Sequence, residues 1–283
     1  MVTKRGRRDA GIPRATRELT HTFRYNDLAS VEEALDDDTA AVILEPTVFE
    51  APKPGFLEGL RALCTRRGAL LIFDEMWTGF RMALGGAQER YGVRADLAVF
   101  SKAIANGMPL SVLTGRAEVM RLLERDVFFF TTFGGEALSL AAARATMEEL
   151  RAHDVPAHLA RQGRRLAEGY HACVRENGLD EVTGCIGWNA RSMITFAGPE
   201  ALLRKSYVQQ EMIARGVLWG GFHNLSYSHG EAEIAAVLGA YREVLPMLRD
   251  AIERGDVHAR LRGEPVEPVF RKTTDFHVKP RSR

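Results

Sequence analysis

The 283-residue sequence predicts an α/β protein with a mostly parallel sheet, followed by a smaller α+β domain. Between residues 31 and 160, short apolar runs alternate with polar turns and helical patterns. Parallel strands are buried on both faces, so they read as continuous apolar runs. After about residue 155 the runs become shorter and helices dominate. We therefore expect a large domain over residues 1–155, a small α+β domain over 156–254 and a tail over 255–283.

Four apolar runs are the expected strands of the large domain. They are short, contain few charges, and end at polar or turn-forming residues such as Pro46. The gaps between the first three leave room for a crossover helix, as parallel pairing requires, whereas a turn that contains Gly107 and Pro109 leads back into the sheet after the third. The expected strands are AAVILEP (40–46), ALLIFD (69–74), ADLAVFSK (95–102) and LSVLTG (110–115).

Helical periodicity is expected in segments that join and follow these strands. In the segment after Pro54, Leu57, Leu60 and Leu63 fall on one helical face, and Gly68 is a stop signal. Later segments are rich in Ala, Leu and Glu, which favour helices. The expected helices are 54–68, 116–125, 135–153, 157–176, 200–214 and 231–253, with two short strands in 181–198 and a strand-like GVLWGG at 216–221.

Composition and charge narrow the class of function. A formal net charge of +1 gives no overall field that would attract nucleic acid or an anionic membrane. No apolar run reaches the roughly 18 residues that a membrane span needs. The basic start, MVTKRGRRDAG, precedes no apolar segment, so we expect a solvated terminus rather than a secretory signal or a nucleic-acid arm. Three scattered cysteines suit a reducing cytoplasm.

Charged residues follow three of the expected strands at the point where each strand ends. The first strand ends in Glu45, the second in Asp74 and Glu75, and the third in Ser101 and Lys102. In open parallel sheets, ligands bind outside the carboxyl ends of the strands. We therefore expect the aspartate and the lysine to face one crevice from adjacent strands.

An aspartate and a lysine in one crevice have two interpretations. In a pyridoxal phosphate site, the lysine amine condenses with the cofactor aldehyde and the carboxylate keeps the pyridine nitrogen protonated. A closed, desolvated pocket would also favour the nucleophilic free amine of the lysine. The other interpretation is a plain salt bridge at the end of a sheet. Spacing alone leaves both open.

Three segments resemble a known family. They are LLIFDEMWTGFR, ADLAVFSKAIANGMPLSVLTGR and TTFGGEALSLAAARAT, which occur in this order. Together they resemble the class III, pyridoxal-phosphate-dependent aminotransferases of fold type I, and within them the glutamate-1-semialdehyde 2,1-aminomutase branch. The resemblance runs from about Gly11 to near Leu248. It implies a fold type I transferase that uses pyridoxal 5'-phosphate and no metal.

The resemblance implies a role for each matching residue. Asp74 would pair with the pyridinium nitrogen, and Met76, where the family commonly has a valine, would pack on the ring face. Lys102 would form the Schiff base and later move the proton between the two carbons of the substrate imine. Thr132, or Thr131 if the register differs by one, would reach the phosphate of the cofactor in the other subunit of a homodimer. The implied function is aminotransferase or aminomutase chemistry on a small amino-carbonyl substrate.

The family is normally longer at its N-terminus than this sequence. The first strands of the sheet and the Gly-Ser turn, which opens a helix on the cofactor phosphate, are expected to be missing. Two explanations remain open: a shortened version of a longer active enzyme, or a true short protein. The latter would be a non-catalytic remnant or a structural subunit that needs a separate N-terminal half. Either way, we expect exposed apolar edges that favour association.

Several other residues are weaker candidates. Ser101, beside the lysine, could donate a hydrogen bond to the cofactor phosphate. His223 and His229 are candidates for substrate contact, because the family places this region near the mouth of the active site. His153 and His158 lack a carboxylate at ligand spacing, so no metal site is expected there.

Overall fold

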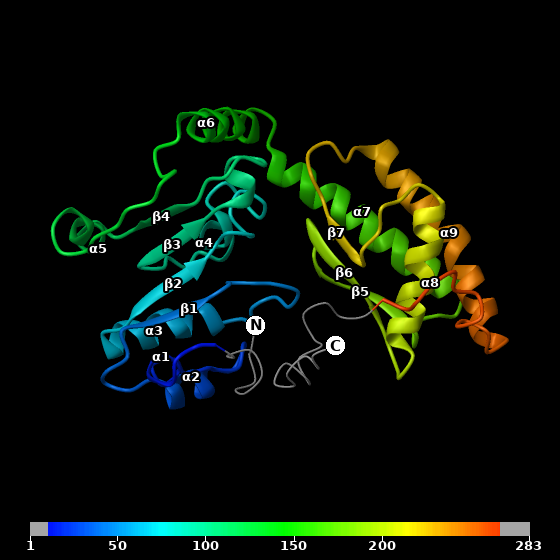
Figure 1. The fold of residues 1–283 in the computed structure, drawn as a ribbon, viewed down its shortest axis with the longest axis horizontal. Helices are drawn as coiled ribbons and strands as arrows, with labels where there is room; N and C mark the ends of the chain where they lie inside the picture. Colours follow the sequence, from blue (N-terminus) through cyan, green and yellow to red (C-terminus); the bar gives the residue numbers. More distant parts are fainter. Residues whose placement is uncertain (1–10, 267–283) are drawn as a thin grey trace, which may run out of the picture. The chain divides into compact units, whose positions relative to one another are not determined.

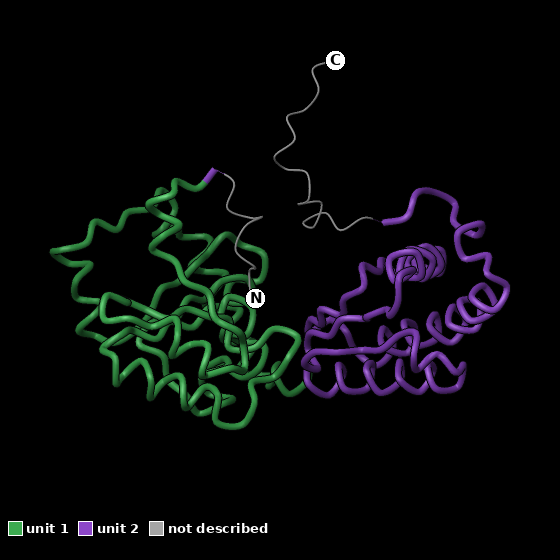
Figure 2. The backbone as a smooth tube through the Cα atoms, turned by 90° about the horizontal axis from the view of Figure 1, so that it is seen from below, with its two compact units in different colours: residues 1–5, 12–158 green, residues 6–11, 159–283 purple. Residues whose placement is uncertain are grey.

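The computed structural model describes residues 11–266, which form two compact units (Figure 2). The first unit contains residues 12–158, and the second begins at Leu159. The chain passes from one unit to the other within helix α7 (Val155–Glu176). No helix among the described residues is both long and apolar enough to cross a membrane.

A four-stranded, mostly parallel sheet forms the centre of the first unit (Figure 1). The strand order is β1-β2-β3-β4; the first three strands are parallel, and β4 is antiparallel to β3. All four expected strands are present, and the predicted fold class is confirmed. The strands are β1 (Ala41–Leu44), β2 (Leu70–Asp74), β3 (Leu97–Phe100) and β4 (Val112–Gly115).

One face of this sheet carries the core of the first unit. Helices α2 (Leu28–Ala34) and α3 (Phe56–Arg67) supply Val31, Leu57 and Leu60 to a cluster with Leu71 and Phe73 of β2. Each of these side chains is at least 97% buried. The side chains that alternate with them are partly exposed, and Ile43 is 60% exposed. Among the described residues, the sheet is therefore covered mainly on one face, whereas its apolar strands predict burial on both.

The remaining helices of the first unit are short, except for α6 (Ala137–Ala152). The expected helix at 116–125 is divided into an α-helical turn and a 3₁₀ turn, which tightens its second half. Three helices, α1, α2 and α4, are missing from the sequence-based expectations because they are too short for a clear 3.6-residue pattern. The elements are α1 (Arg14–Glu18), α4 (Gly86–Tyr91), η1 (Lys102–Ile104), α5 (Ala117–Met120), η2 (Arg121–Glu124) and α6 (Ala137–Ala152).

The second unit is a three-stranded antiparallel sheet with long helices. Its strand order is β5-β6-β7, and the two strands expected in 181–198 are β5 and β6. Helices α7 and α9 supply its fully buried residues Tyr170 and Tyr241, whose rings meet edge to face with centroids 4.8 Å apart. The elements that follow α7 are β5 (Thr183–Trp188), β6 (Arg191–Phe196), α8 (Ala201–Ala214), β7 (Phe222–Asn224) and α9 (Glu231–Glu253).

The strand expected at GVLWGG is wrong. The third strand of this sheet, β7, begins at Phe222, directly after the segment ends at Gly221. Gly216 and Gly221 have φ angles of +80° and +90°, which a strand does not allow. Trp219 is buried and donates its Nε1 hydrogen to the Tyr241 hydroxyl. The apolar character of the segment thus reflects one buried anchor in an irregular loop.

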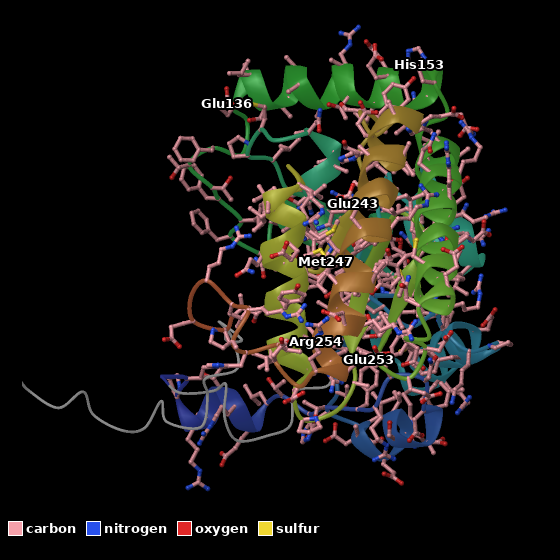
Figure 3. All side chains as sticks on the ribbon, turned by 90° about the vertical axis from the view of Figure 1, so that its right-hand side faces the viewer. Glu136, His153, Glu243, Met247, Glu253 and Arg254 are labelled. Carbon is pink, nitrogen blue, oxygen red and sulfur yellow. The ribbon has the colours of Figure 1, made fainter. Side chains whose placement is uncertain are left out.

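Charged side chains join α9 to its neighbours, and Glu243, labelled in Figure 3, is one of them. Arg215, which follows α8, donates from Nε to Glu243 of α9 at 2.8 Å. Arg260, in the predicted tail, pairs with Asp250 of α9 at 2.7 Å. The described part of the tail therefore packs on the second unit, and residues 267–283 lie outside the described residues.

Candidate active site

The ends of β2 and β3 bring the aspartate and the lysine to adjacent strands. Asp74 is the last residue of β2 and is the register partner of Val99 on β3. Lys102 follows the end of β3 by two residues and begins the 3₁₀ turn η1. Because β2 and β3 are parallel, both residues lie at the carboxyl edge of the sheet (Figure 1).

The Asp74 carboxylate lines a depression in the first unit. The depression has a volume of about 300 Å³, and Asp74 is half-buried at its edge. Its Oδ1 accepts a hydrogen bond from the backbone N–H of Met76 at 3.0 Å. This bond orients the carboxylate. The other lining residues are Thr20, His21, Thr22, Phe23, Tyr25, Ile43, Leu44 and Glu45.

Lys102 has an unusual backbone conformation and an exposed side chain. Its φ angle is +52°, in the left-handed region, which is uncommon for a residue with a Cβ and concentrates at functional sites. Asn106 and Gly107, in the turn that follows, also have positive φ angles. The side chain is exposed in the described chain. The closed, desolvated pocket expected around this lysine is therefore not formed by the described residues alone.

Ser101 braces the turn that carries Lys102. Its Oγ donates to the carbonyl of Leu110 at 2.8 Å and accepts a hydrogen bond from Ser111 Oγ at 3.1 Å. A serine has one hydroxyl proton, and here that proton is used by the backbone. The expected donation from Ser101 to a cofactor phosphate stays a prediction, and it would require this hydroxyl to turn away from the Leu110 carbonyl. In the structure, the two serines join the start and end of the turn.

The second acid of the pair, Glu75, has a different environment from Asp74. It is fully buried, and its Oε2 accepts hydrogen bonds from Thr78 Oγ1 and from the N–H of Ala87 at 2.8 Å. Its Oε1 accepts a hydrogen bond from the N–H of Gln88 at 2.9 Å. Ala87 and Gln88 lie in the first turn of α4, whose N–H groups have no partner within the helix. Glu75 thus caps a helix twelve residues further along the chain.

Thr132 lies on an exposed segment between η2 and α6. Thr131 and Thr132 are both exposed, as are Phe128, Phe130 and Phe133, with exposed fractions of 93%, 75% and 70%. Large apolar patches on a surface mark contacts with other molecules. The segment is therefore available to a second molecule rather than packed into its own unit.

Tyr25 is a site residue that sequence reasoning missed. Its hydroxyl donates to the carbonyl of Pro46 at 2.6 Å, and its ring packs edge to face on Phe56 at 5.1 Å. Burial raises the pKa of the Tyr25 hydroxyl well above its ordinary value. The bond fixes the segment around Thr20–Tyr25 beside the end of β1. An aromatic residue before a turn, as in RYND, is the only signal that could have indicated this role.

The histidines do not form a second site. His223 is 6% exposed, and its ring nitrogens contact Ser192 Oγ and the Tyr241 hydroxyl, so the second unit encloses this ring. The expected contact of His223 with substrate stays a prediction. His229 accepts a hydrogen bond from the N–H of Ser226 at 2.9 Å. Within residues 11–266, no group of three or more His, Cys, Asp or Glu side chains is arranged to hold a metal ion.

Comparison with known families decides the family of the chain. The model of the family described as aminotransferase class-III matches residues 6–227. The chain belongs to this family. The matched range includes all four strands of the first sheet, Asp74, Lys102 and the exposed threonines.

Curated members of the class-III aminotransferase family resemble the chain over most of its length. It is 34% identical over 261 residues to a glutamate-1-semialdehyde 2,1-aminomutase of Nitrosospira multiformis. It is 36% identical over 250 residues to a 3-aminobutyryl-CoA aminotransferase of Cloacimonas acidaminovorans. Each match covers 83% of this chain and 60% of the relative. The chain thus spans about three fifths of the length of these class-III aminotransferase relatives.

Solved structures confirm the fold type I architecture of this family member. The FumI protein of a Sphingopyxis species, in its PLP internal aldimine form, matches with a TM-score of 0.79 and 27% identity. That match covers 86% of this chain and 61% of FumI. A glutamate-1-semialdehyde-aminomutase variant of Pseudomonas aeruginosa in complex with PMP matches with a TM-score of 0.70 and 27% identity, covering 88% of this chain and 60% of that protein.

Proposed function

We propose that the chain carries the lysine half of a pyridoxal phosphate site. Its reaction would be amino transfer, or intramolecular amino exchange, on a small amino-carbonyl substrate. The observation that carries this proposal is the placement of Asp74 and Lys102 at the carboxyl ends of adjacent parallel strands. Membership of the class-III aminotransferase family supports it.

The acid and the amine fit the two ends of this cofactor. A carboxylate such as Asp74, oriented by the Met76 N–H and lining a depression, can accept a hydrogen bond from the N–H of a pyridinium ring and so keep that nitrogen protonated. The Lys102 amine is exposed and can condense with an aldehyde. When bound, pyridoxal phosphate supplies an electron sink that stabilises a carbanion on the substrate.

Each residue of the site would have a separate role. Asp74 would hold the cofactor ring through its nitrogen, and Met76 would pack against the ring. Lys102 would hold the cofactor covalently at rest. Once displaced by a substrate amine, the free Lys102 amine would act as acid and base, taking a proton from the substrate carbon of the imine and returning it to the imine's other carbon. The hydrogen bonds of Ser101 with Leu110 and Ser111 would keep the Lys102 amine at the end of β3 during this transfer.

Thr132 would act in a homodimer. The exposed segment around it supports a role outside its own unit, because a phosphate contact in a partner's site requires an accessible hydroxyl. The phenylalanines beside it would be covered by the same association.

A second candidate function is a non-catalytic subunit. The exposed face of β1 at Ile43 and the open surroundings of Lys102 favour it, because both leave the site incomplete in the described chain. In that case a separate polypeptide would supply the phosphate anchor.

Turnover of the full chain tests the proposal. The chain with added pyridoxal phosphate is incubated with a panel of small amino donors, with pyruvate as acceptor and without it, and the carbonyl products are quantified. We expect product from the wild type, none above background from Lys102→Ala, and wild-type rates from Lys53→Ala, which removes another exposed lysine. Repeated turnover without pyruvate, on a donor that carries both an amino and a carbonyl group and yields its isomer, would indicate intramolecular exchange. Equal rates for Lys102→Ala, or no product from any protein, would contradict an autonomous enzyme.

A further inference from the structure

The two acids that end β2 lie on opposite sides of the sheet. Along β2, Leu71 and Phe73 are fully buried on the helix-covered face, whereas Ile72 and Asp74 are partly exposed. The Glu75 N–H donates to the Val99 carbonyl at 2.9 Å, so the ladder to β3 continues through this residue. Side chains alternate along a strand, and Glu75 therefore enters the covered side while Asp74 faces the open side.

The buried side chain of Glu75 is fixed on three sides. The hydroxyl of Thr78 and the N–H groups of Ala87 and Gln88 converge on its two oxygens. Gly86 has a φ of +73°, and a Cβ at this position would lie 2.5 Å from Glu75 Oε2. The backbone of α4 thus approaches the carboxylate more closely than any other residue type would allow. A carboxyl group in a buried place is tolerated only with hydrogen-bond partners such as these.

The anchored glutamate also fixes the residues on either side of it. Met76 follows Glu75 directly, and its N–H donates to Asp74 Oδ1. The loop between β2 and α4 is closed at one end by this bond and at the other by the cap on α4. The Glu75 carbonyl accepts a hydrogen bond from the Gly79 N–H at 2.8 Å, so this bond also restrains the peptide that joins Glu75 to Met76. If the Glu75 side chain left its place, that bond alone would restrain the peptide, and the bond from the Met76 N–H that orients Asp74 would be weakened.

We propose that Glu75 is a positioning residue for Asp74: by anchoring the end of β2 to α4, it sets the direction of the carboxylate that faces the depression. The inference deepens the proposed function and rests on it where Asp74 is taken to hold the cofactor. The orientation of Asp74 itself does not depend on the cofactor.

Amide hydrogen exchange in the full chain without cofactor tests the positioning directly. In Glu75→Gln, an NH₂ group replaces one acceptor oxygen and faces a backbone N–H, so the cap is broken at nearly constant volume. We expect the Met76 amide to exchange at least about tenfold faster, the scale of losing a hydrogen bond to a charged group. Asp74→Ala should give the same gain, and the double variant no more than either. Glu89→Gln is the matched control, because Glu89 caps the N–H of Gly85 at 2.6 Å on the exposed side of the same helix.

A second readout connects the anchor to the cofactor. Borohydride trapping of pyridoxal phosphate on Lys102 is quantified by mass spectrometry over a range of cofactor concentrations. We expect Glu75→Gln to raise the half-saturating concentration about tenfold in the wild-type background and less than about twofold in an Asp74→Ala background. A merely structural role would raise it equally in both. Thr78→Val, which removes one donor to Glu75, should show the same pattern with a smaller effect if Glu75→Gln does not fold.

The outcomes separate this inference from the proposed function. Unchanged Met76 exchange in Glu75→Gln, with trapping on Lys102 intact, would overturn the positioning role alone. Faster Met76 exchange without any trapping on Lys102 in the wild type would uphold the positioning role and overturn the cofactor site. Equal effects of Glu75→Gln in both trapping backgrounds would also overturn the inference.

Discussion

Protonation of His223 should destabilise the second unit in acid. The ring is enclosed, with Nδ1 2.8 Å from Ser192 Oγ and Nε2 2.7 Å from the Tyr241 hydroxyl. The Tyr241 hydroxyl already accepts a hydrogen bond from Trp219 Nε1, so its own proton points to His223 Nε2. The neutral imidazole therefore donates from Nδ1 to Ser192. Neither Ser192 nor Tyr241, the two partners of the ring, is an anion that would stabilise a positive charge on it.

The size of the effect follows from the pKa of His223. Burial lowers this pKa from 6.5 to about 4 in the folded chain. Between these two values the unfolded chain binds more protons than the folded one, so stability falls as the pH falls. The contribution of the neutral His223 ring to the free energy of unfolding is complete above about pH 6.5 and is lost progressively toward pH 4. At pH 4, protonation favours the unfolded chain over the folded chain by a factor of about 10 to the power 2.2. At about 1.4 kcal/mol for each factor of ten, this gives roughly 3 kcal/mol.

Urea unfolding of the wild type and His223→Gln, measured between pH 7.5 and pH 4, tests this value. Unfolding of the second unit is followed by hydrogen exchange of α9 peptides, because two units need not unfold together. Carboxylates titrate alike in both proteins, so the difference isolates His223. We expect the wild type to lose about 3 kcal/mol more than the variant over this range. Equal losses, within about 1 kcal/mol, would refute the reasoning, since the native imidazole would then be solvated or already charged.

Other packing predictions follow from single contacts. In α7, a Cβ at Gly163 would lie 1.8 Å from the backbone carbonyl oxygen of Asn189. Gly163→Ala should therefore lower the free energy of unfolding of the second unit, measured in urea, by about 1–3 kcal/mol. Gly239→Ala in α9, where no atom lies within 4 Å, should be neutral or stabilising; a matching loss there would contradict the steric explanation. Asp96 is 4% exposed and accepts hydrogen bonds from Arg61, Arg116 and the N–H of Leu71. Burial raises its pKa, but these bonds outweigh burial and hold it below its ordinary value. Asp96→Asn should therefore destabilise the first unit by about 3 kcal/mol in urea at pH 7. Glu118→Gln, which removes the exposed partner of Arg116, should change little; an equal loss would show that the buried position is not decisive.

Strand ends were the part of the site that the sequence could predict. Apolar runs placed β2 and β3, and the rule that parallel strands expose ligands at their carboxyl ends then brought Asp74 and Lys102 to one edge. The positive φ angle of Lys102 could not be predicted, because it depends on a turn closed by Ser101 and Ser111 from opposite ends. The exposure of the lysine depends on which elements cover the sheet, and local pattern says nothing about that.

The role of Glu75 shows a second limit of sequence reasoning. Asp74 and Glu75 look equivalent as an acid pair, yet one faces the depression and the other caps α4. Alternation along a strand predicts that they diverge, but not which side is covered. The prediction of a strand at GVLWGG was wrong for a related reason. Trp219 is buried and held by a hydrogen bond to Tyr241 of α9, and the pairing of β7 with β6 begins only at Phe222.

The central claim is that Lys102 and Asp74 form half of a pyridoxal phosphate site. The most direct measurement is borohydride reduction of the full chain with pyridoxal phosphate, followed by mass spectrometric mapping of the modified lysines in the wild type, Lys102→Ala and Asp74→Ala. The account predicts saturable modification at Lys102 in the wild type, weaker modification at Lys102 in Asp74→Ala, and only scattered labelling in Lys102→Ala. Modification spread equally over exposed lysines such as Lys53 in all three proteins would contradict it.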